Sequence, residues 1–285
     1  MLRILIWQVS NDMTFKDYAL KILEYQHDGL EIVGEASNDD IAKVDRGGDY
    51  EILAVGAKKI GMSKVTQDAR RLNLLEEKLL GDWIVTIPGF TLEKYRKLQR
   101  SRLSIFAMNC FGGLISHTLG LPFYAPVINM FLVANDYMHL LHSLRGYMEE
   151  KPILKEMKWQ TDLKFYYPIV MLGDITIYMN HYPDFDKAVA KWNERKQKIN
   201  WYNLFVTAHT GDKKFLEQFD ALPYAKKVCF VPFKSDLDSA WYINPEIKKS
   251  WEFWNIVNHF AVGAPFYYDV FDMLLYGKKT PLIEM

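Results

Sequence analysis

Cysteine is scarce in this chain, with only Cys110 and Cys229 among 285 residues. The two form no C-x-x-C pair, and no zinc-binding pattern can be assembled from them. His139 and His142 have the i, i+3 spacing of metal ligands, but no third ligand is evident. These absences exclude a disulfide framework and an identifiable metal site. We therefore expect no metal, and we expect the reducing cytoplasm as the compartment.

An excess of charge is also missing, because 35 basic residues balance 35 acidic ones. Without a basic block, the chain has no electrostatic reason to bind nucleic acid or an anionic membrane. The apolar N-terminal stretch is too short for a signal sequence. No run of about 18 apolar residues occurs, which argues against a membrane-spanning helix. We expect a chain that binds no nucleic acid and has no integral membrane segment.

Several signature motifs are absent as well. The chain has no G-x-G-x-x-G fingerprint and no Walker loop, so a standard nucleotide or dinucleotide site is not indicated. It also lacks the G-x-S-x-G elbow of serine hydrolases and the signatures of kinases and deaminases. We therefore expect no cofactor.

What the first 100 residues do contain is an alternation of apolar strands and amphipathic helices. The pattern predicts strands at 2–9, 30–36, 50–57 and 82–88, and helices at 14–27, 63–80 and 91–99. This alternation is typical of a small, Rossmann-like parallel sheet, so residues 1–100 are interpreted as an α/β domain. The turn after its first strand has no glycine, which favours a scaffolding or docking role over a nucleotide site.

Residues 101–285 are interpreted as a second α/β domain with an aromatic helical C-terminal tail. The pattern predicts strands at 127–133, 163–167, 175–179, 203–208 and 227–233, and helices at 135–147, 187–199, 213–219, 250–260 and 267–276. A chain of 285 residues is long enough for two such domains.

The most distinctive stretch of the second domain runs from 104 to 122. An apolar, strand-like run breaks at Asn109-Cys110-Phe111-Gly112-Gly113, and apolar residues then resume at helical spacing. This pattern predicts a strand-to-helix turn with Cys110 near a helix N-terminus, where the macrodipole favours a thiolate. Gly112 and Gly113 allow close approach of another molecule. A functional Cys110 and a buried structural cysteine both fit the pattern.

A thiolate needs a basic or cationic partner, most often an imidazole. Of the seven histidines, His181 is the best candidate, because it ends an apolar strand just before a helix. A hydrogen-bonded histidine that caps a strand end fits the same position. Asn109 and Asp174 are candidate orienting or oxyanion-binding groups. His117 lies two helical turns after Cys110, about 10 Å along the axis, and is a candidate for lining the same cleft.

Arg195 lies on the helix predicted after His181, with Lys191 and Lys198 near it on the same helix. Such a cationic stripe suits a carboxylate or a phosphate, which a guanidinium binds bidentately. A solvated helix face, balanced by Glu194, fits the same spacing. Arg195 is therefore a candidate substrate-binding residue with an open alternative.

Residues from about 83 to 233 resemble the bacterial family called domain of unknown function 1919, whose members are usually described as exopolysaccharide biosynthesis proteins. The motifs that carry the resemblance are Asn109-Cys110-Phe-Gly-Gly113, Leu119-Gly120-Leu121-Pro-Phe-Tyr124 with Pro126, His181-Tyr182, Lys191-Trp192-Asn193-x-Arg195, Ile199-Asn200, Leu204-Phe205-Val206, Phe219-Asp220 and Lys227-Val228. The resemblance implies cell-surface polysaccharide biosynthesis, a carbohydrate or activated-sugar substrate, and glycosyltransferase partners. It makes Trp192 a further candidate for substrate binding. The order of Cys110 and His181 is also similar to that in papain-like enzymes.

The sequence supports three hypotheses about function. The first is an acyl transferase or hydrolase with Cys110 as nucleophile, His181 as general base, Arg195 as anion anchor, and Asn109 or a backbone N–H as oxyanion donor. The second is a glycosyltransferase-like enzyme that uses a nucleotide sugar and no cysteine chemistry. The third is a non-catalytic partner of the biosynthetic machinery that docks through its aromatic tail, residues 241–276.

Overall fold

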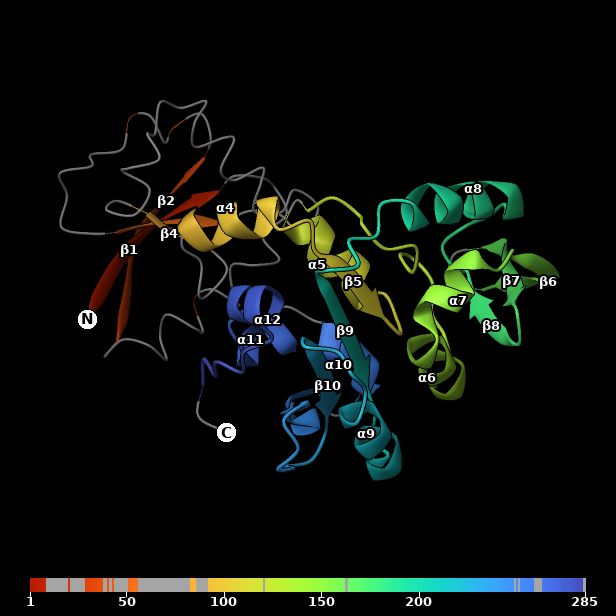
Figure 1. Ribbon diagram of the computed structural model, residues 1–285. Coiled ribbons are helices and arrows are strands. Elements are labelled where there is room, and N and C mark those ends of the chain that lie inside the picture. The colour runs from red at the N-terminus through yellow and green to blue at the C-terminus, as the bar shows by residue number, and fades with distance from the viewer. Residues whose placement is uncertain are drawn as a thin grey trace. The chain divides into compact units, whose positions relative to one another are not determined.

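The computed structural model describes residues 1–8, 20, 29–37, 40, 43, 51–55, 83–85, 92–119, 121–161, 164–248, 250, 252–258 and 263–283 (Figure 1). The chain forms two compact units. Unit 1 contains Met1–Ser101, Ser116–Pro122 and Ile247–Met285, and unit 2 contains Arg102–Ile115 and Phe123–Glu246. This division differs from a single boundary near residue 100, because the C-terminal segment belongs with the N-terminal unit.

Unit 1 is built on a four-stranded parallel sheet in the order β2-β1-β3-β4. Its strands are β1 (Leu2–Gln8), β2 (Leu30–Ser37), β3 (Glu51–Val55) and β4 (Trp83–Val85), which match the four predicted strands. Ile4, Ile6 and Trp7 of β1 have no exposed surface, as expected of a strand with neighbours on both sides. The helices predicted at 14–27 and 63–80 lie outside the described residues, except for Leu20, which is helical.

The C-terminal region adds helices to unit 1. They are α10 (Phe253–Asn258), α11 (Ala264–Tyr267) and α12 (Val270–Tyr276), preceded by the short 3₁₀ helix η2 (Pro245–Lys248). Helix α12 packs against α4 (Leu92–Arg100), which closely matches the helix predicted at 91–99. Asp269 begins α12 by accepting the N–H groups of Phe271 and Asp272 at 2.9 and 3.0 Å.

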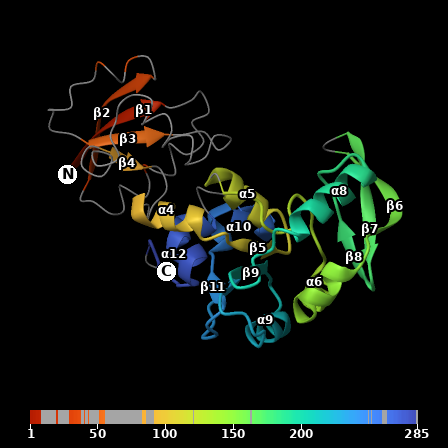
Figure 2. The ribbon, with the colours of Figure 1, turned by 45° about the horizontal axis from the view of Figure 1, so that its top comes forward.

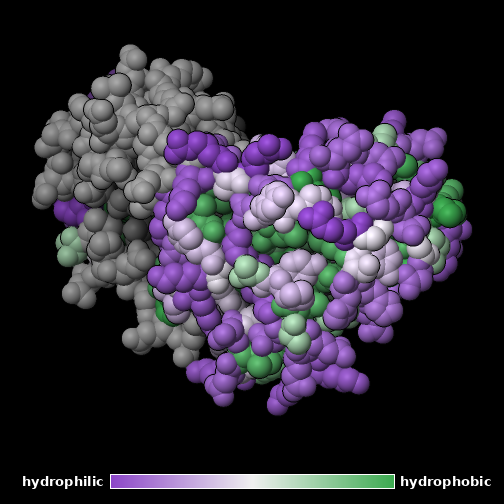
Figure 3. All heavy atoms as spheres, in the orientation of Figure 1, coloured by the Kyte–Doolittle hydropathy of each residue, from purple (hydrophilic) through white to green (hydrophobic). Residues whose placement is uncertain are grey.

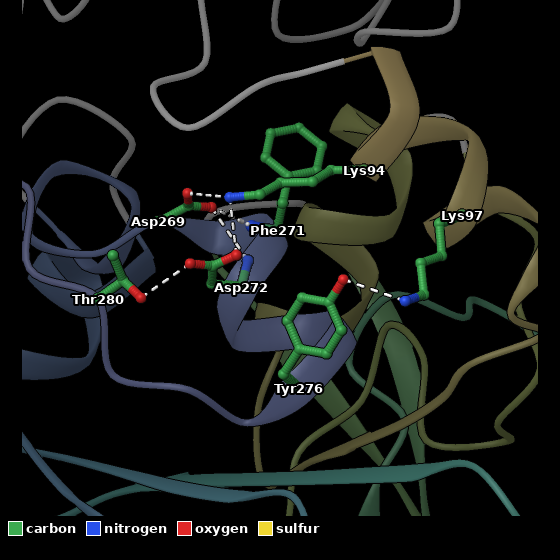
Figure 4. A network of polar contacts seen from close by, with 7 residues as sticks. All are labelled: Lys94, Lys97, Asp269, Phe271, Asp272, Tyr276 and Thr280. Carbon is green, nitrogen blue, oxygen red and sulfur yellow. Dashed lines mark hydrogen bonds and ion pairs between the residues drawn. The ribbon is translucent and has the colours of Figure 1, made fainter.

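Lys94 joins α4 to this region (Figure 4). Its Nζ lies 2.8 Å from Asp269 Oδ2 and 2.7 Å from Asp272 Oδ1, and both aspartates are buried. Thr280 Oγ1 donates a hydrogen bond to Asp272 Oδ2 at 2.8 Å. A buried carboxylate is tolerated when it is paired and hydrogen-bonded, and Lys94 supplies that pairing from 175 residues away. The C-terminal region therefore belongs to unit 1.

Unit 2 contains a second parallel sheet in the order β11-β10-β9-β5 (Figure 2). Its strands are β5 (Ser104–Ala107), β9 (Leu204–His209), β10 (Lys227–Val231) and β11 (Ala240–Tyr242). The prediction of an α/β fold with parallel sheets is confirmed in both units. Ala107 of β5 pairs with Thr207 of β9. Because parallel strands end at the same edge of a sheet, the residues that follow Ala107 and Thr207 meet there.

Between β5 and β9 the chain forms an antiparallel sheet in the order β6-β7-β8. Its strands are β6 (Ile153–Gln160), β7 (Phe165–Leu172) and β8 (Ile175–Tyr178), and the helices of this unit are α6 (Ala134–His142), α7 (Leu144–Glu149), α8 (Phe185–Lys196) and α9 (Lys213–Asp220). Helix α5 (Phe111–Thr118) begins in unit 2, and its last residues belong to unit 1. Within the described residues, no helix is both long and apolar enough to cross a membrane.

Two predicted elements of unit 2 differ from the structure. The strand predicted at 127–133 is wrong, because only Phe131 forms a bridge, to Tyr178. Asn129 has a φ of 61°, which interrupts an extended chain. The helix predicted at 135–147 is divided into α6 and α7 at Ser143, whose φ of −132° is not helical. Strands β6 and β11 were not predicted from the pattern.

Candidate functional site

Cys110 lies between β5 and α5, at the edge where β5 and β9 end. The Cys110 carbonyl accepts the N–H of Leu114 at 2.9 Å, so Cys110 is the residue at which the helix begins. Its side chain is half-buried, whereas the side chain of Cys229 on β10 has no exposed surface. Of the two thiols, Cys110 is therefore the one that a reagent or substrate can reach.

Asn109 holds the turn in front of Cys110. Its Oδ1 accepts the N–H of Phe111 at 3.0 Å, which satisfies one of the first N–H groups of α5. Its Nδ2 lies 3.3 Å from Nδ1 of His209, at the end of β9. Both ends of this buried amide are engaged by the chain, so the structure gives Asn109 an orienting role.

His181 is brought to Cys110 from a separate part of unit 2. It follows β8 and precedes α8, which Asp184 caps by accepting the N–H of Lys187 at 2.8 Å. His181 Nε2 lies 3.4 Å from Cys110 Sγ, although the residues are 71 positions apart. The imidazole is exposed and the thiol is half-buried. The fold thus brings together a sulfur and a ring nitrogen within reach of proton transfer.

Burial keeps both members of this pair uncharged near neutral pH. It raises the pKa of the Cys110 thiol to about 11. Although His181 is exposed, part of its ring is removed from solvent, and this partial desolvation lowers the pKa of His181 below its ordinary value of 6.5. Burial therefore opposes the thiolate that the helix N-terminus favours. The resting pair is a thiol beside a neutral imidazole, which suits general-base activation of the sulfur during attack.

His209 is a second imidazole at this edge, and sequence reasoning did not single it out. Burial lowers its pKa to about 4, so the ring is neutral at pH 7. If Asn109 Nδ2 donates to Nδ1, as amide chemistry requires, the ring hydrogen of His209 resides on Nε2. The available signal was its place at the end of a predicted strand. The missing information was that β9 pairs with β5.

Arg195 of α8 is held beside the residue that follows His181. Its Nη1 donates to the hydroxyl of Tyr182 at 2.7 Å, and that hydroxyl donates to the carbonyl of Ile128 at 3.0 Å. The guanidinium also lies over the ring of Phe123, with its carbon 5.1 Å from the ring centre. Within the described part of the chain, no carboxylate forms an ion pair with Arg195.

The neighbouring lysines behave differently. Lys191 and Lys198 both bond to Glu194, at 2.8 and 2.6 Å. Both lysine charges that were predicted to form a cationic stripe with Arg195 are therefore paired with Glu194 in exposed ion pairs. Arg195 is thus the member of the predicted stripe whose charge faces aromatic and hydroxyl groups.

Gly112 and Gly113 allow close packing of α5 against its own unit. A Cβ on Gly112 would lie 3.1 Å from Cγ2 of Ile105, and one on Gly113 would lie 3.2 Å from Oδ1 of Asn129. The predicted close approach therefore exists, but the chain itself supplies the approaching atoms. In the direction of a Cβ, the space at both glycines is therefore filled by the chain's own packing.

Three other predicted residues lie elsewhere or outside the description. Trp192 has no exposed surface and belongs to the core of unit 2, so the structure does not place it where a substrate makes contact. The side chain of His117 lies outside the described residues, although its backbone is part of α5. Asp174 accepts the hydroxyl hydrogen of Tyr147 at 2.5 Å and does not join the Cys110 pair. Among the described residues, no group of three His, Cys, Asp or Glu is arranged to hold a metal.

Comparison with known proteins places this site in a shared region. The family model described as Domain of unknown function (DUF1919) matches residues 84–277, which is more than half of the chain. A protein of Haemophilus influenzae, described as an uncharacterized protein, is 30% identical over 182 residues. That match covers 62% of this chain and 84% of the relative. The interval matched by the family model contains Cys110, His181, Arg195 and His209.

Proposed function

The chain belongs to the family described as Domain of unknown function (DUF1919), and we propose that its Cys110–His181 pair is the centre of an acyl transferase or hydrolase. The observation that supports this most strongly is the 3.4 Å separation of Cys110 Sγ and His181 Nε2. At that distance an imidazole can take the thiol proton as the sulfur attacks a carbonyl carbon. The exposed ring of His181 leaves one side of the pair open to a substrate.

The proposed reaction has two steps. In the first, Cys110 Sγ bonds to the acyl carbon while its proton passes to His181 Nε2. The bond between the acyl carbon and the leaving oxygen then breaks, and His181 returns the proton to that oxygen. In the second step, an acceptor hydroxyl attacks the thioester and gives its proton to His181. The departing sulfur recovers that proton, so both residues end unchanged. Water as acceptor gives a hydrolase, and a sugar hydroxyl gives a transferase.

The first turn of α5 supplies donors for the negative oxygen that forms in each step. Within the described residues, the N–H groups of Gly112 and Gly113 have no hydrogen-bond partner. They belong to the N-terminal end of the helix that Cys110 begins, where backbone N–H groups and the helix dipole favour negative charge. We assign these N–H groups as the oxyanion donors, because the Asn109 amide is already engaged at both ends.

The proposed substrate is an acylated or acyl-accepting carbohydrate in cell-surface polysaccharide biosynthesis. The resemblance to exopolysaccharide biosynthesis proteins supports this setting, and the Cys110 chemistry is compatible with ester transfer between sugar hydroxyls. Glycosyltransferases are the partners that this setting implies.

The test of the chemistry is whether an activated ester acylates Cys110 in the folded protein. We expect 4-nitrophenyl acetate to release a stoichiometric burst of 4-nitrophenolate and to leave an acetyl group on Cys110, as shown by peptide mass spectrometry. Cys229 is the internal control, because full burial raises the pKa of its thiol and blocks access. Acetylation of neither thiol, or of both only after unfolding, would overturn the proposal.

Arg195 is proposed as the anchor for an anionic group of the substrate. Replacing Arg195 with Met should lower the preference of Cys110 for an anionic ester by about tenfold, because one charge-assisted hydrogen bond is lost. The measurement is the ratio of acylation rates for the mono-4-nitrophenyl ester of glutaric acid and for 4-nitrophenyl acetate. The rate with the neutral acetate should stay the same, since the Cys110–His181 pair is untouched.

Lys198→Met is the matched control, because Lys198 follows the end of α8 (Phe185–Lys196) and is only three residues from Arg195. Lys198 is bonded to Glu194 at 2.6 Å, so its loss should leave the ratio of the two rates unchanged. If the ratio of the two rates is unchanged in Arg195→Met, Arg195 only packs against Tyr182 and Phe123 and does not bind the anionic group of the substrate. Equal losses in both variants would indicate general electrostatic attraction and no anchor.

A further inference from the structure

Strand β6 is an exposed edge strand of the antiparallel sheet in unit 2. Among the described residues it pairs with β7 alone, because the order of the sheet is β6-β7-β8. All of its residues from Ile153 to Trp159 are exposed. An edge strand of this length presents a row of backbone N–H and C=O groups that can pair with another strand.

Large apolar side chains gather on this edge. Leu154, Met157 and Trp159 of β6 are 41%, 37% and 49% exposed, and Tyr166 of β7 is 56% exposed. Register places Trp159 opposite Tyr166, and their rings lie 5.1 Å apart in an edge-on arrangement. Figure 3 shows a small hydrophobic patch among hydrophilic surface in the part of unit 2 where Figure 1 places β6. Exposed apolar clusters of this kind mark interaction sites.

The charges of β6 are complementary to a second copy of the same strand. Glu156 and Lys158 flank Met157 and, being two positions apart, lie on the same face of the sheet. In an antiparallel pair of two β6 strands centred on Met157, Glu156 of each copy lies opposite Lys158 of the other. Each such pair of opposite charges contributes about 0.2–1 kcal/mol relative to alanine, and like charges at the same positions are unfavourable.

We propose that two copies of this chain associate through antiparallel pairing of their β6 strands, with the two Met157 residues at the two-fold axis. The two three-stranded sheets then become one continuous sheet. The Glu156–Lys158 pairs lie on one face of this joined sheet, and the apolar side chains of both copies lie side by side on the opposite face. This inference is independent of the chemistry at Cys110.

The lysines of β6 do not contradict this pairing. Lysine on an edge strand commonly prevents association between sheets. Here Glu156 offers Lys158 a partner in the centred register, while a pairing shifted by two residues places like charges or uncharged side chains opposite them. The same charges therefore favour one register over others. Because a single strand pair is a small interface, we expect a dissociation constant on the order of micromolar.

The test is the oligomeric state of charge-reversed variants. Sedimentation velocity of the whole chain should show a dimer at tens of micromolar. Glu156→Lys and Lys158→Glu should each raise the dissociation constant of the dimer by at least about tenfold. The double variant Glu156→Lys with Lys158→Glu should dimerise again. An equimolar mixture of the two single variants should also dimerise, because every facing pair is then of opposite charge.

Two results would overturn the proposal. One is a wild-type chain that stays monomeric at about 100 micromolar, far above the expected dissociation constant. The other is a dimer that neither single reversal weakens, which would place the contact elsewhere. Lys151→Glu, which changes an exposed charge outside β6, is the control for net charge. Circular dichroism of each variant separates a lost interface from a lost fold.

Discussion

Replacing His181 with alanine should slow the acetylation of Cys110 by about 10²- to 10⁴-fold. The expected loss is large because burial raises the pKa of the Cys110 thiol to about 11, so very little thiolate exists near neutral pH. The neutral imidazole 3.4 Å from the sulfur removes the proton during attack, and among the described residues no other side chain makes a hydrogen bond to Sγ. The exposed position of His181 means that its loss should leave the fold intact.

The pH dependence of this reaction distinguishes general-base action from a structural role. The rate of the native protein should fall as pH drops through the lowered pKa of His181, below 6.5, because a protonated imidazole cannot accept a proton. Above that pKa the rate should be level until the thiol itself ionises. In His181→Ala the rate should instead rise about tenfold per pH unit up to the pKa of Cys110, because it follows thiolate concentration.

His142→Ala is the control for histidine removal, since His142 is an exposed residue of α6 in the same unit. It should keep both the rate and the pH profile. Added imidazole should restore part of the activity of His181→Ala and have little effect on the control. A His181→Ala protein with the native rate and the native profile would remove His181 from the mechanism.

The sequence was informative about this site at the level of strand ends. Cys110 and His181 both follow apolar runs, and that position is where α/β folds display working side chains. The pattern made His181 the best candidate of seven histidines, but it could not show that the ring reaches the sulfur, because that depends on how a sheet and a loop pack. Arg195 and Trp192 illustrate the same limit. They share a helix, yet one contacts Tyr182 and the other is buried in the core.

Elements whose hydrophobic periodicity is weak could not be predicted from the sequence pattern. Strand β6 carries three charged residues among eight and exposes nearly all of its length, so it has no buried face for an alternation to reveal. The sequence also contained no indication that the C-terminal helices belong to unit 1. That membership depends on packing between distant parts of the chain, such as that of α12 against α4 with Lys94 bonded to Asp269 and Asp272, which no local spacing indicates.

That contact predicts a large loss of stability when Lys94 is replaced with Met. Removing the cation leaves the Asp269 and Asp272 side chains, which are 5% and 11% exposed, without their opposite charge. Breaking a buried ion pair by removing one partner costs about 3–5 kcal/mol, and the lower end applies because the Lys94 side chain is 27% exposed. Hydrogen exchange of α4 and α12 in increasing urea measures the effect in the unit concerned.

The cost of Lys94→Met should depend on pH with a definite sign. In the native protein, burial raises the pKa of Asp272, but hydrogen bonds from Lys94 and Thr280 outweigh it and hold the pKa below 3.8. A lowered pKa adds stability above pH 3.8 that is lost as pH falls through the folded value. Without Lys94, burial raises the pKa and protonation relieves the penalty. The difference in unfolding free energy between the two proteins should therefore be largest at neutral pH and shrink toward pH 4.

Lys97→Met provides the comparison that separates a buried pair from a surface contact (Figure 4). Lys97 lies on the same helix and donates to the hydroxyl of Tyr276 at 3.2 Å, but it is exposed and faces no carboxylate in the described structure. Its replacement should change stability by no more than about 0.5 kcal/mol. Similar losses in the two variants would mean that charge on α4, and not the pairing of Asp269 and Asp272, stabilises unit 1. A loss confined to Lys94→Met would identify this ion pair as what holds the C-terminal helices to α4.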